Sequence, residues 1–420
     1  MTSTLGSILC LLGLADCSSP PLPSSDPFYT PPSGYQSLSP GDIIQSRPVP
    51  FALDDLTNYT AAYQLMFRTT NALGDPEAAI TTVIVPDNAQ NDKLISYQVA
   101  EDAAWIGCAP SYELQVTDED STIQTLINAG WYVNVPDYEG PNSSFTAGIQ
   151  AGQATLDSIR ASLQSTSITG LQSDSVVSLW GYSGGSVATG WAAQLQPSYA
   201  PDLSSHFVGA AVGGFVVNIS AVALNVNGGI DAGFVPAGIM GLASAYPEVG
   251  TLLNSYLTPL IGARIAEVED QCLLADLLDF AYEDIFIYWT IGEGILYLPL
   301  VQQVVAENTL GETPPTVPMY IYQGEEDEVV PYTIVDEVVS QYCAAGATIE
   351  YWKDPVETHL GEASVGAPFA FSWLNARMSG TPAATGCATY TSEFSGTPTN
   401  VAKRAVQTQY APPQARYVKP

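Results

Sequence analysis

The chain has 420 residues, of which 46% are hydrophobic and only 13% are charged. Its 11 Lys and Arg residues stand against 43 Asp and Glu residues, so the formal net charge is −32. This excess of negative charge argues against binding to nucleic acid or to anionic membrane surfaces, and it favours a protein that stays soluble in an acidic medium.

The N-terminus carries an apolar run at residues 5–15 that is too short to span a bilayer. Small residues and two prolines follow it, and the usual basic residue before the run is absent. The pattern predicts a secretory signal peptide over residues 1–17. No later stretch indicates a transmembrane helix, so we expect a secreted, extracellular protein without stable membrane insertion.

The cysteines fit an oxidising compartment. Cleavage after Cys17 would leave four of the six cysteines, an even number suited to two disulfides, and the sequence alone allows three pairings. Three N-x-S/T sequons, at Asn58, Asn142 and Asn218, predict N-glycosylation of a secreted chain.

The first part of the body, residues 18–216, begins with a Pro- and Ser-rich stretch at 18–50 that predicts an extended arm. Residues 63–70 and 78–85 predict an antiparallel hairpin. Strands and helices then alternate, with strands expected at 93–100, 131–136, 175–180 and 207–214 and helices at 122–130, 146–163 and 186–195, the last ending near Pro197. This order indicates an α/β fold with a mixed, mainly parallel sheet and helices on both faces.

A G-x-S-x-G pattern at residues 181–185 joins an apolar strand to an Ala-rich helix. Strand, sharp turn and helix together are typical of a nucleophile elbow that presents Ser183. A Cβ at Gly181 or Gly185 would collide with the adjoining strand or helix, and the N–H of Gly184 would face negative charge that develops beside Ser183. The alternative is a glycine-rich turn whose serine only caps the helix.

Residues 217–312 interrupt the alternation. They are apolar and mostly helix-like, which favours an inserted helical cap over the alternative of ordinary helices that cover the sheet. Residues 313–420 return to the core and contain the last predicted strands, at 317–323 and 347–352.

A serine nucleophile needs a base, and the chain offers only two histidines. His206 stands where a strand begins and reads as a surface residue. His359 lies in a loop after the final predicted strand, where a hydrolase with the triad order Ser, acid, His has its base. We therefore expect His359 to act on Ser183.

The acid is expected at the end of the preceding strand, where residues 323–331 hold four carboxylates. Asp327 is the favoured candidate because a short acid after a glycine and before a Val-Pro turn points back towards the histidine. Glu325 and Glu326 remain alternatives. The loop at residues 100–110 should supply a second oxyanion N–H, and the sequence pattern leaves open which residue donates it.

Four segments resemble the fungal secretory lipase family: residues 96–112, the elbow with Trp180 in place of the family's Glu, residues 327–331, and residues 359–360. The resemblance implies an α/β-hydrolase fold with a helical lid inserted before the acid strand. It implies the triad Ser183, Asp327 and His359, with the N–H groups of Asp102 and Gly184 as the oxyanion hole. The family pairing implies the disulfides Cys108–Cys272 and Cys343–Cys387. The tail beyond Cys387 differs, which leaves the family's C-terminal flap in doubt here.

These expectations describe a secreted serine lipase that hydrolyses triacylglycerol esters through an acyl-enzyme on Ser183, with possible acyl transfer to alcohols. The chemistry needs no metal and no organic cofactor. The expected partner is a lipid ester at an oil–water interface, and a monomer is expected. Alternatives are a carboxylesterase for soluble short-chain esters, a serine carboxypeptidase and an inactive hydrolase-fold binding protein.

Overall fold

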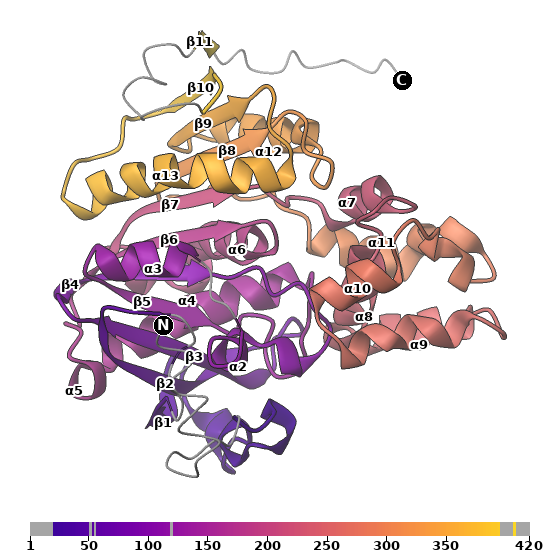
Figure 1. The fold of residues 1–420 in the computed structure, drawn as a ribbon, viewed down its shortest axis with the longest axis horizontal. Coiled ribbons are helices and arrows are strands. Elements are labelled where there is room, and N and C mark those ends of the chain that lie inside the picture. Colours follow the sequence, from indigo (N-terminus) through magenta and orange to yellow (C-terminus); the bar gives the residue numbers. More distant parts are fainter. Residues whose placement is uncertain (1–19, 50–52, 54–55, 118–120, 395–405, 409–420) are drawn as a thin grey trace, which may run out of the picture.

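The structure is a computed structural model that describes residues 20–49, 53, 56–117, 121–394 and 406–408. The predicted signal peptide, with Cys10 and Cys17, lies outside the described residues, and so does most of the tail after Phe394. The described residues form one twisted sheet with helices on both faces and a helical cap at one end (Figure 1).

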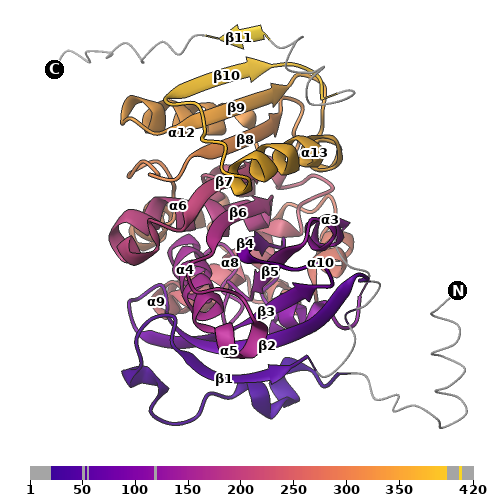
Figure 2. The same cartoon turned by 90° about the vertical axis from the view of Figure 1, so that its left-hand side faces the viewer.

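The sheet has eleven strands in the order β1-β2-β3-β5-β4-β6-β7-β8-β9-β10-β11, and Figure 2 shows them stacked along the length of the molecule. The strands are β1 (Ile43–Pro48), β2 (Tyr59–Thr70), β3 (Pro76–Pro86), β4 (Gln90–Gln98), β5 (Trp131–Pro136), β6 (Val176–Tyr182), β7 (Phe207–Gly213), β8 (Met319–Gly324), β9 (Ile349–Asp354), β10 (Cys387–Thr391) and β11 (Val406–Thr408). Strands β4 to β10 pair in parallel, whereas β1, β2, β3 and β11 pair antiparallel to their neighbours. The carboxyl ends of the parallel strands therefore meet at one edge of the sheet.

Helices cover both faces of this sheet. The helices of the core are α2 (Pro110–Glu113), α3 (Ser121–Asn128), α4 (Gly148–Gln164), α5 (Thr166–Thr169), α6 (Gly184–Tyr199), α12 (Tyr332–Ala344) and α13 (His359–Met378), and the short 3-10 turns are η1 (Pro23–Ser25), η2 (Pro27–Tyr29), η3 (Tyr35–Ser37), η4 (Ile106–Cys108) and η5 (Pro201–Leu203). Apolar residues of α4, α6 and α12 form one buried layer, and those of α3 and α13 form the other. Such two-sided burial explains why β6 is an almost continuous apolar run.

Between β7 and β8 the chain forms a helical insertion, called the cap below, for which the sequence predicted the bounds 217–312. Its elements are α7 (Ile219–Val226), α8 (Phe234–Ala245), α9 (Pro247–Ser255), η6 (Gly262–Asp270), α10 (Leu273–Asp279), η7 (Ile285–Tyr288), η8 (Gly292–Tyr297) and α11 (Pro299–Glu307). They gather beyond one end of the strands and do not cover a sheet face (Figure 1), so the inserted cap describes them better than sheet-covering helices. None of the helices in the described part of the chain is both long and apolar enough to cross a membrane.

One expectation about local structure was wrong. The strand at 347–352 is not the last, since β10 and β11 follow it. The predicted extended arm includes β1, which pairs with β2 through residues 43–48. Helix α6 includes Pro197 and ends at Tyr199, near the predicted end.

Candidate active site

Ser183 occupies the sharp turn between β6 and α6. Its backbone has φ 52° and ψ −123°, a conformation that residues other than glycine rarely adopt. The turn is held by Ser183 N–H, which donates to Gly213 O at 3.0 Å, and by Ser186 N–H, which donates to Ser183 O at 2.8 Å. Strain of this kind persists only where the surrounding structure enforces it, and it is common at catalytic residues.

The two glycines that flank this turn sit where a side chain has no room. A Cβ on Gly181 would overlap the carbonyl of Gly185 in α6, and a Cβ on Gly185 would overlap the carbonyl of Gln98 in β4. The collisions expected from the sequence are present, one with the helix and one with the strand. They allow α6 to start close to the sheet, directly behind Ser183.

His359 lies beside Ser183, with 2.8 Å between its Nε2 and Ser183 Oγ. It is not in a loop, as the sequence indicated, but is the first residue of α13. The Thr358 hydroxyl caps this helix by accepting the N–H of Gly361 at 3.3 Å, which fixes the point where the helix begins. The start of α13 thus sets the position of the imidazole.

Two contacts that the sequence analysis missed hold the backbone of His359. Its N–H donates to Glu328 Oε2 at 3.0 Å, and its carbonyl accepts the Tyr182 hydroxyl at 2.6 Å. Tyr182 also places its ring 5.3 Å from the imidazole, between centroids. The position of Tyr182, directly before Ser183 in the sequence, was the only sequence signal that Tyr182 helps to hold His359.

Asp327 is the carboxylate that reaches His359. Its Oδ2 and Oδ1 lie 2.9 and 3.0 Å from His359 Nδ1. The carboxylate also accepts the N–H groups of Val329 and Val330 at 2.9 and 2.7 Å, and the amide of buried Gln323 at 2.7 Å. These donors fix the carboxylate, so His359 carries its proton on Nδ1 and leaves Nε2 free to accept the proton of Ser183.

The other candidate residues are placed elsewhere. Glu325 pairs with Lys353 at 3.3 Å, and Glu326 is exposed to solvent. The ring of His206 lies at the start of β7, where Nδ1 is 2.9 Å from Ser175 O. None of these three side chains is placed to complete the chain that runs from Ser183 through His359 to Asp327.

Asp102 lies next to Gly184, in the loop after β4. It adopts a positive φ of 50° and is almost completely buried. Its carboxyl stands against Gly184, because a Cβ added to Gly184 would overlap Asp102 Oδ1. Asp102 Oδ1 has no hydrogen-bond partner among the described residues. Gly184 and Asp102 therefore border the same small space next to Ser183.

Buried carboxyls surround this loop. Burial raises the pKa of Asp102 to about 7, and His359 opposes the shift. Burial also raises the pKa of Glu139 well above its usual range; Asp102 raises it further, whereas the backbone N–H groups of Asp102 and Ala103 lower it. The pKa of Glu101 is raised in the same way, by burial first and by Glu139 second. These carboxyls gather around Asp102, whose own carboxyl stands against Gly184.

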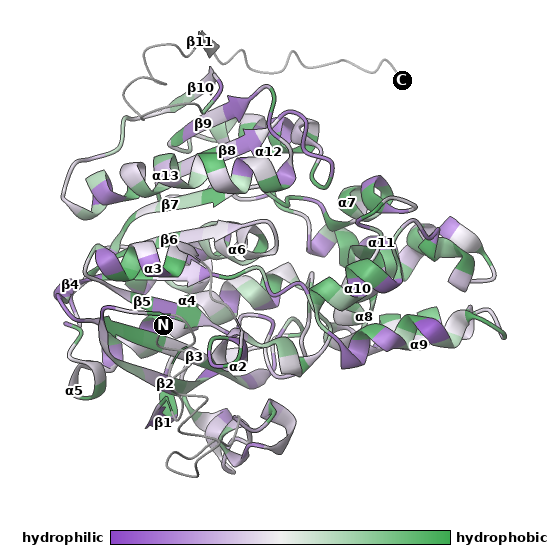
Figure 3. Ribbon diagram, in the orientation of Figure 1, coloured by the Kyte–Doolittle hydropathy of each residue, from purple (hydrophilic) through white to green (hydrophobic). Residues whose placement is uncertain are grey.

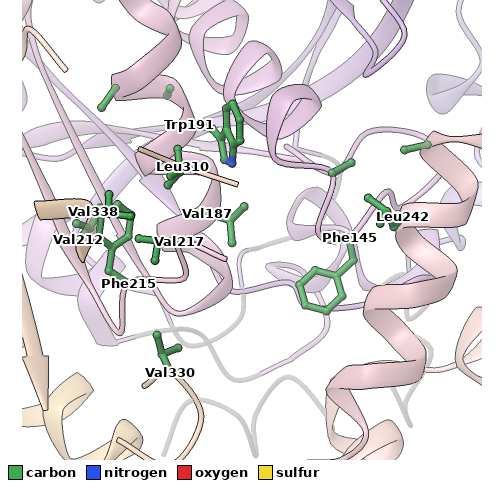
Figure 4. Packing of buried hydrophobic residues seen from close by; sticks show 14 of the residues in the cluster. Phe145, Val187, Trp191, Val212, Phe215, Val217, Leu242, Leu310, Val330 and Val338 are labelled. Carbon is green, nitrogen blue, oxygen red and sulfur yellow. The ribbon is translucent and has the colours of Figure 1, made fainter. Parts of the chain in front are cut away.

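An apolar cavity extends from Ser183 into the cap. Its wall near Ser183 includes Asp102 and Gly184, and beyond them it is lined by side chains of α7, α8, α9, η8 and α11. Figure 4 shows Phe145 of the core lying between Val187 of α6 and Leu242 of α8, three residues of this wall. Hydrophobic residues dominate the helices that enclose the cavity (Figure 3). A long apolar chain attached to a group at Ser183 would fit these surroundings.

Two disulfides connect elements around the site. Cys108 pairs with Cys272, joining the loop that follows Asp102 to the residue that precedes α10 of the cap. Cys343 pairs with Cys387, joining α12 to β10. No free cysteine remains among the described residues.

The three sequon asparagines differ in their surroundings. Asn58 and Asn142 are exposed. Asn218 is half-buried, and its Oδ1 caps α7 by accepting the N–H groups of Ser220 and Ala221, both at 3.1 Å. Glycosylation of Asn58, Asn142 and Asn218 stays a prediction, with Asn218 the most confined acceptor.

Comparison with known proteins places this geometry in a family. Residues 109–386 match the family model described as secretory lipase. Lipase A of Arthroderma benhamiae is 40% identical over 388 residues, which cover 88% of this chain and 82% of that protein. Lipase 5 of Candida albicans is 41% identical over 391 residues, which cover 88% of this chain and 83% of that one.

A solved structure resembles the fold over the same extent. The crystal structure of Candida antarctica lipase A in its closed state has a TM-score of 0.81 and 32% sequence identity, and the match covers 88% of this chain and 89% of that one. The mostly parallel sheet with its helices is that of an α/β hydrolase.

Proposed function

This chain belongs to the secretory lipase family and is a triacylglycerol lipase, and we propose that its reaction runs through an acyl-enzyme on Ser183. The observation that supports this most is the chain of contacts from Ser183 through His359 to Asp327, with an apolar cavity that begins at Ser183. The contacts supply an activated nucleophile, and the cavity suits the acyl part of a lipid ester.

In the first half-reaction, Ser183 Oγ attacks the ester carbonyl while its proton passes to His359 Nε2. Asp327 holds the imidazole in the productive tautomer and stabilises the imidazolium that forms. The proton then moves from Nε2 to the leaving glycerol oxygen, and the acyl group stays on Ser183. Water releases the fatty acid in the second half-reaction, or an alcohol takes the acyl group in its place.

The oxyanion of each tetrahedral intermediate is held by two donors. Gly184 contributes its N–H from the start of α6, where the helix dipole also favours negative charge. For residue 102 the backbone N–H was expected from the sequence, and that stays a prediction. We infer that the donor is the protonated carboxyl of Asp102, because it stands against Gly184 and its Oδ1 has no hydrogen-bond partner among the described residues.

The cap acts in this proposal as a lid and an acyl-chain channel. Its connection to the oxyanion loop through Cys108–Cys272 lets a movement of α10 reach the residues beside Asp102. Family membership and the two disulfides suggest secretion, and we propose a secreted monomer whose substrate is a lipid ester at an oil–water interface.

The test of function compares one short triacylglycerol below and above its solubility limit. A lipase of this form is expected to hydrolyse the emulsion faster than the saturated solution, because substrate at a surface reaches the apolar cavity directly. A rate that does not rise above the limit would favour a carboxylesterase. Absence of both hydrolysis and labelling by a fluorophosphonate would identify an inactive binding protein.

The role of the Asp102 carboxyl predicts a particular pH dependence. Below pH about 7 the carboxyl is protonated and donates to the oxyanion; above it, a negative charge faces the oxyanion and the rate falls. Asp102→Ala should lower kcat on the order of 10²- to 10³-fold. Asp102→Asn keeps a donor that does not titrate and should lose the fall in kcat/KM above pH 7. The loss in kcat and the change in the pH dependence of kcat/KM are both measured from pH–rate profiles with a soluble ester as substrate.

Asp174→Asn serves as the matched control, because Asp174 is exposed and precedes β6, whereas Ser183 follows the other end of that strand. It should reproduce the wild-type pH profile. If Asp102→Ala retains the wild-type rate, the backbone N–H of residue 102 is the donor and the carboxyl is not.

A further inference from the structure

Glu328 directly follows the acid of the triad in the chain and contacts a different part of the same histidine. Asp327 holds the imidazole through Nδ1, whereas Glu328 Oε2 accepts the backbone N–H of His359 at 3.0 Å. Because His359 is the first residue of α13, no carbonyl of that helix is available to its N–H. The helix dipole also favours a carboxylate at this end. Glu328 therefore holds the backbone from which the imidazole projects.

The loop that carries both acids, residues 324–331, is fastened to the segment that leads into α13. We call it the acid loop. Glu325 N–H donates to Asp354 O at 2.7 Å, and Glu326 N–H donates to Glu357 O at 3.2 Å. The two segments approach so closely that a Cβ on Gly324 would overlap Glu357 O. A shift of the acid loop would therefore also move the start of α13.

Asn225 of the cap holds the acid loop from another side. It lies in the last turn of α7 and is exposed to solvent. Its Nδ2 donates to Glu328 O at 2.7 Å and to Val329 O at 3.2 Å. The N–H of Val329 donates to Asp327 Oδ1 at 2.9 Å. This short stretch of backbone is thus bonded to the cap through its carbonyls and to the acid of the triad through an N–H.

Helix α7 also forms part of the wall of the apolar cavity that begins at Ser183. Ile219, Val222 and Ala223 of this helix line the cavity, together with Val329 of the acid loop. Asn225 is not among the residues that line it. Asn225 therefore connects the cavity wall to the acid loop without contacting an acyl chain itself.

The chain passes close to the base both before and after α7. Gly214, where the chain leaves β7 for the cap, lies so close that an added Cβ would be 2.8 Å from His359 Cε1. Asp231 follows α7, and burial raises the pKa of its carboxyl; Glu328 raises this pKa further, whereas His359 opposes the shift. These contacts place the base and the acid loop against the part of the cap that contains α7.

We propose that Glu328 is a positioning residue for His359 and that Asn225 couples it to α7, so that a long acyl chain packed against α7 improves the alignment of the base. This inference rests on the proposed acyl-enzyme at Ser183. An acetyl group is too short to fill the cavity, whereas an octanoyl chain extends into it and supports α7. Esters of the two lengths should therefore depend to different extents on the bond from Asn225.

The test measures kcat and KM of the full chain on p-nitrophenyl acetate and p-nitrophenyl octanoate, both below their solubility limits. Glu328→Ala should lower kcat on the octanoate by about tenfold with little change in KM. Glu328→Gln keeps an acceptor for the N–H of His359 and should restore most of that loss. Asn225→Ala should lower kcat by about threefold on the octanoate and by less on the acetate. The matched controls Glu326→Ala and Asn254→Ala remove exposed side chains of the acid loop and of α9, and both should match the wild type.

The double variant Asn225→Ala, Glu328→Ala should have nearly the same octanoate kcat as Glu328→Ala alone, because the coupling acts through the Glu328 side chain. Losses that simply multiply would overturn the coupling. A Glu328→Ala protein with the wild-type kcat, or one that Glu328→Gln does not improve on, would overturn the positioning role. A wild type that hydrolyses neither ester would refute the proposed function and this inference with it, whereas equal hydrolysis by the wild type and all variants would overturn this inference alone.

Discussion

Replacing Ser183 with Ala is expected to lower kcat on tributyrin by about 10⁶-fold and to leave a properly folded protein. The Ser183 hydroxyl is the group that lies 2.8 Å from His359 Nε2 and the atom proposed to carry the acyl group. Without it, only the oxyanion donors and substrate binding contribute, which is worth about 10³- to 10⁴-fold over water in triad enzymes. Titration of released fatty acid at constant pH measures the loss.

The control for this substitution is Ser198→Ala, which removes an exposed hydroxyl at the end of the same helix α6. It should keep wild-type activity. Ser183→Ala should unfold at a temperature similar to that of the wild type, because its methyl group occupies the same strained turn. A Ser183→Ala protein that hydrolyses tributyrin at more than a small fraction of the wild-type rate would contradict the assignment of the nucleophile.

Replacing Asp327 with Asn is expected to lower kcat by about 10⁴-fold. An amide that donates towards His359 Nδ1 favours the tautomer with its proton on Nε2, and that tautomer is unable to accept the proton of Ser183. The N–H groups of Val329 and Val330 still hold the side-chain oxygen, so the loop should keep its shape. Steady-state kinetics on a soluble ester should show the loss in kcat with little change in KM.

Glu326→Gln is the matched control, one residue earlier in the same loop. Its side chain is exposed and does not reach His359, so the variant should have the wild-type kcat. If Glu326→Gln loses as much activity as Asp327→Asn, the acid assigned from the hydrogen bonds is wrong.

The elbow and the base could be predicted from sequence for different reasons. Ser183 is recognisable because an apolar strand and an Ala-rich helix flank a pattern of small residues. His359 is recognisable because the chain has only two histidines, and His206 stands before a strand that follows the elbow. For both the nucleophile and the base, the sequence contains few other residues that could perform the same step.

The acid is different, because four carboxylates compete within a few residues. What distinguishes Asp327 in the structure is a set of donors, among them Val329, Val330 and Gln323. Two of those donors are backbone N–H groups, and the residue types at these positions do not reveal them. The Gln323 side chain was a usable signal, since a fully buried polar residue at the end of a strand needs a partner nearby.

Sequence patterns alone could not predict the role of the Asp102 carboxyl or the outer strands of the sheet. The placement of the Asp102 carboxyl against Gly184 depends on the path of a loop with positive φ, which no periodicity encodes. Strands β1 and β10 lie towards the margins of the sheet, and their residues are mostly half-buried, so they lack the apolar run of β6. Edge strands gain their structure from pairing rather than from a hydrophobic pattern.

The most direct test that the lipase reaction passes through Ser183 is labelling with a phosphonate analogue of a triacylglycerol, followed by peptide mass spectrometry. Inactivation should follow the attachment of one phosphonate per molecule, on Ser183, and should fall away in His359→Ala. Complete inactivation with the adduct on another residue, or full activity with Ser183 occupied, would contradict the proposal that the lipase reaction passes through Ser183.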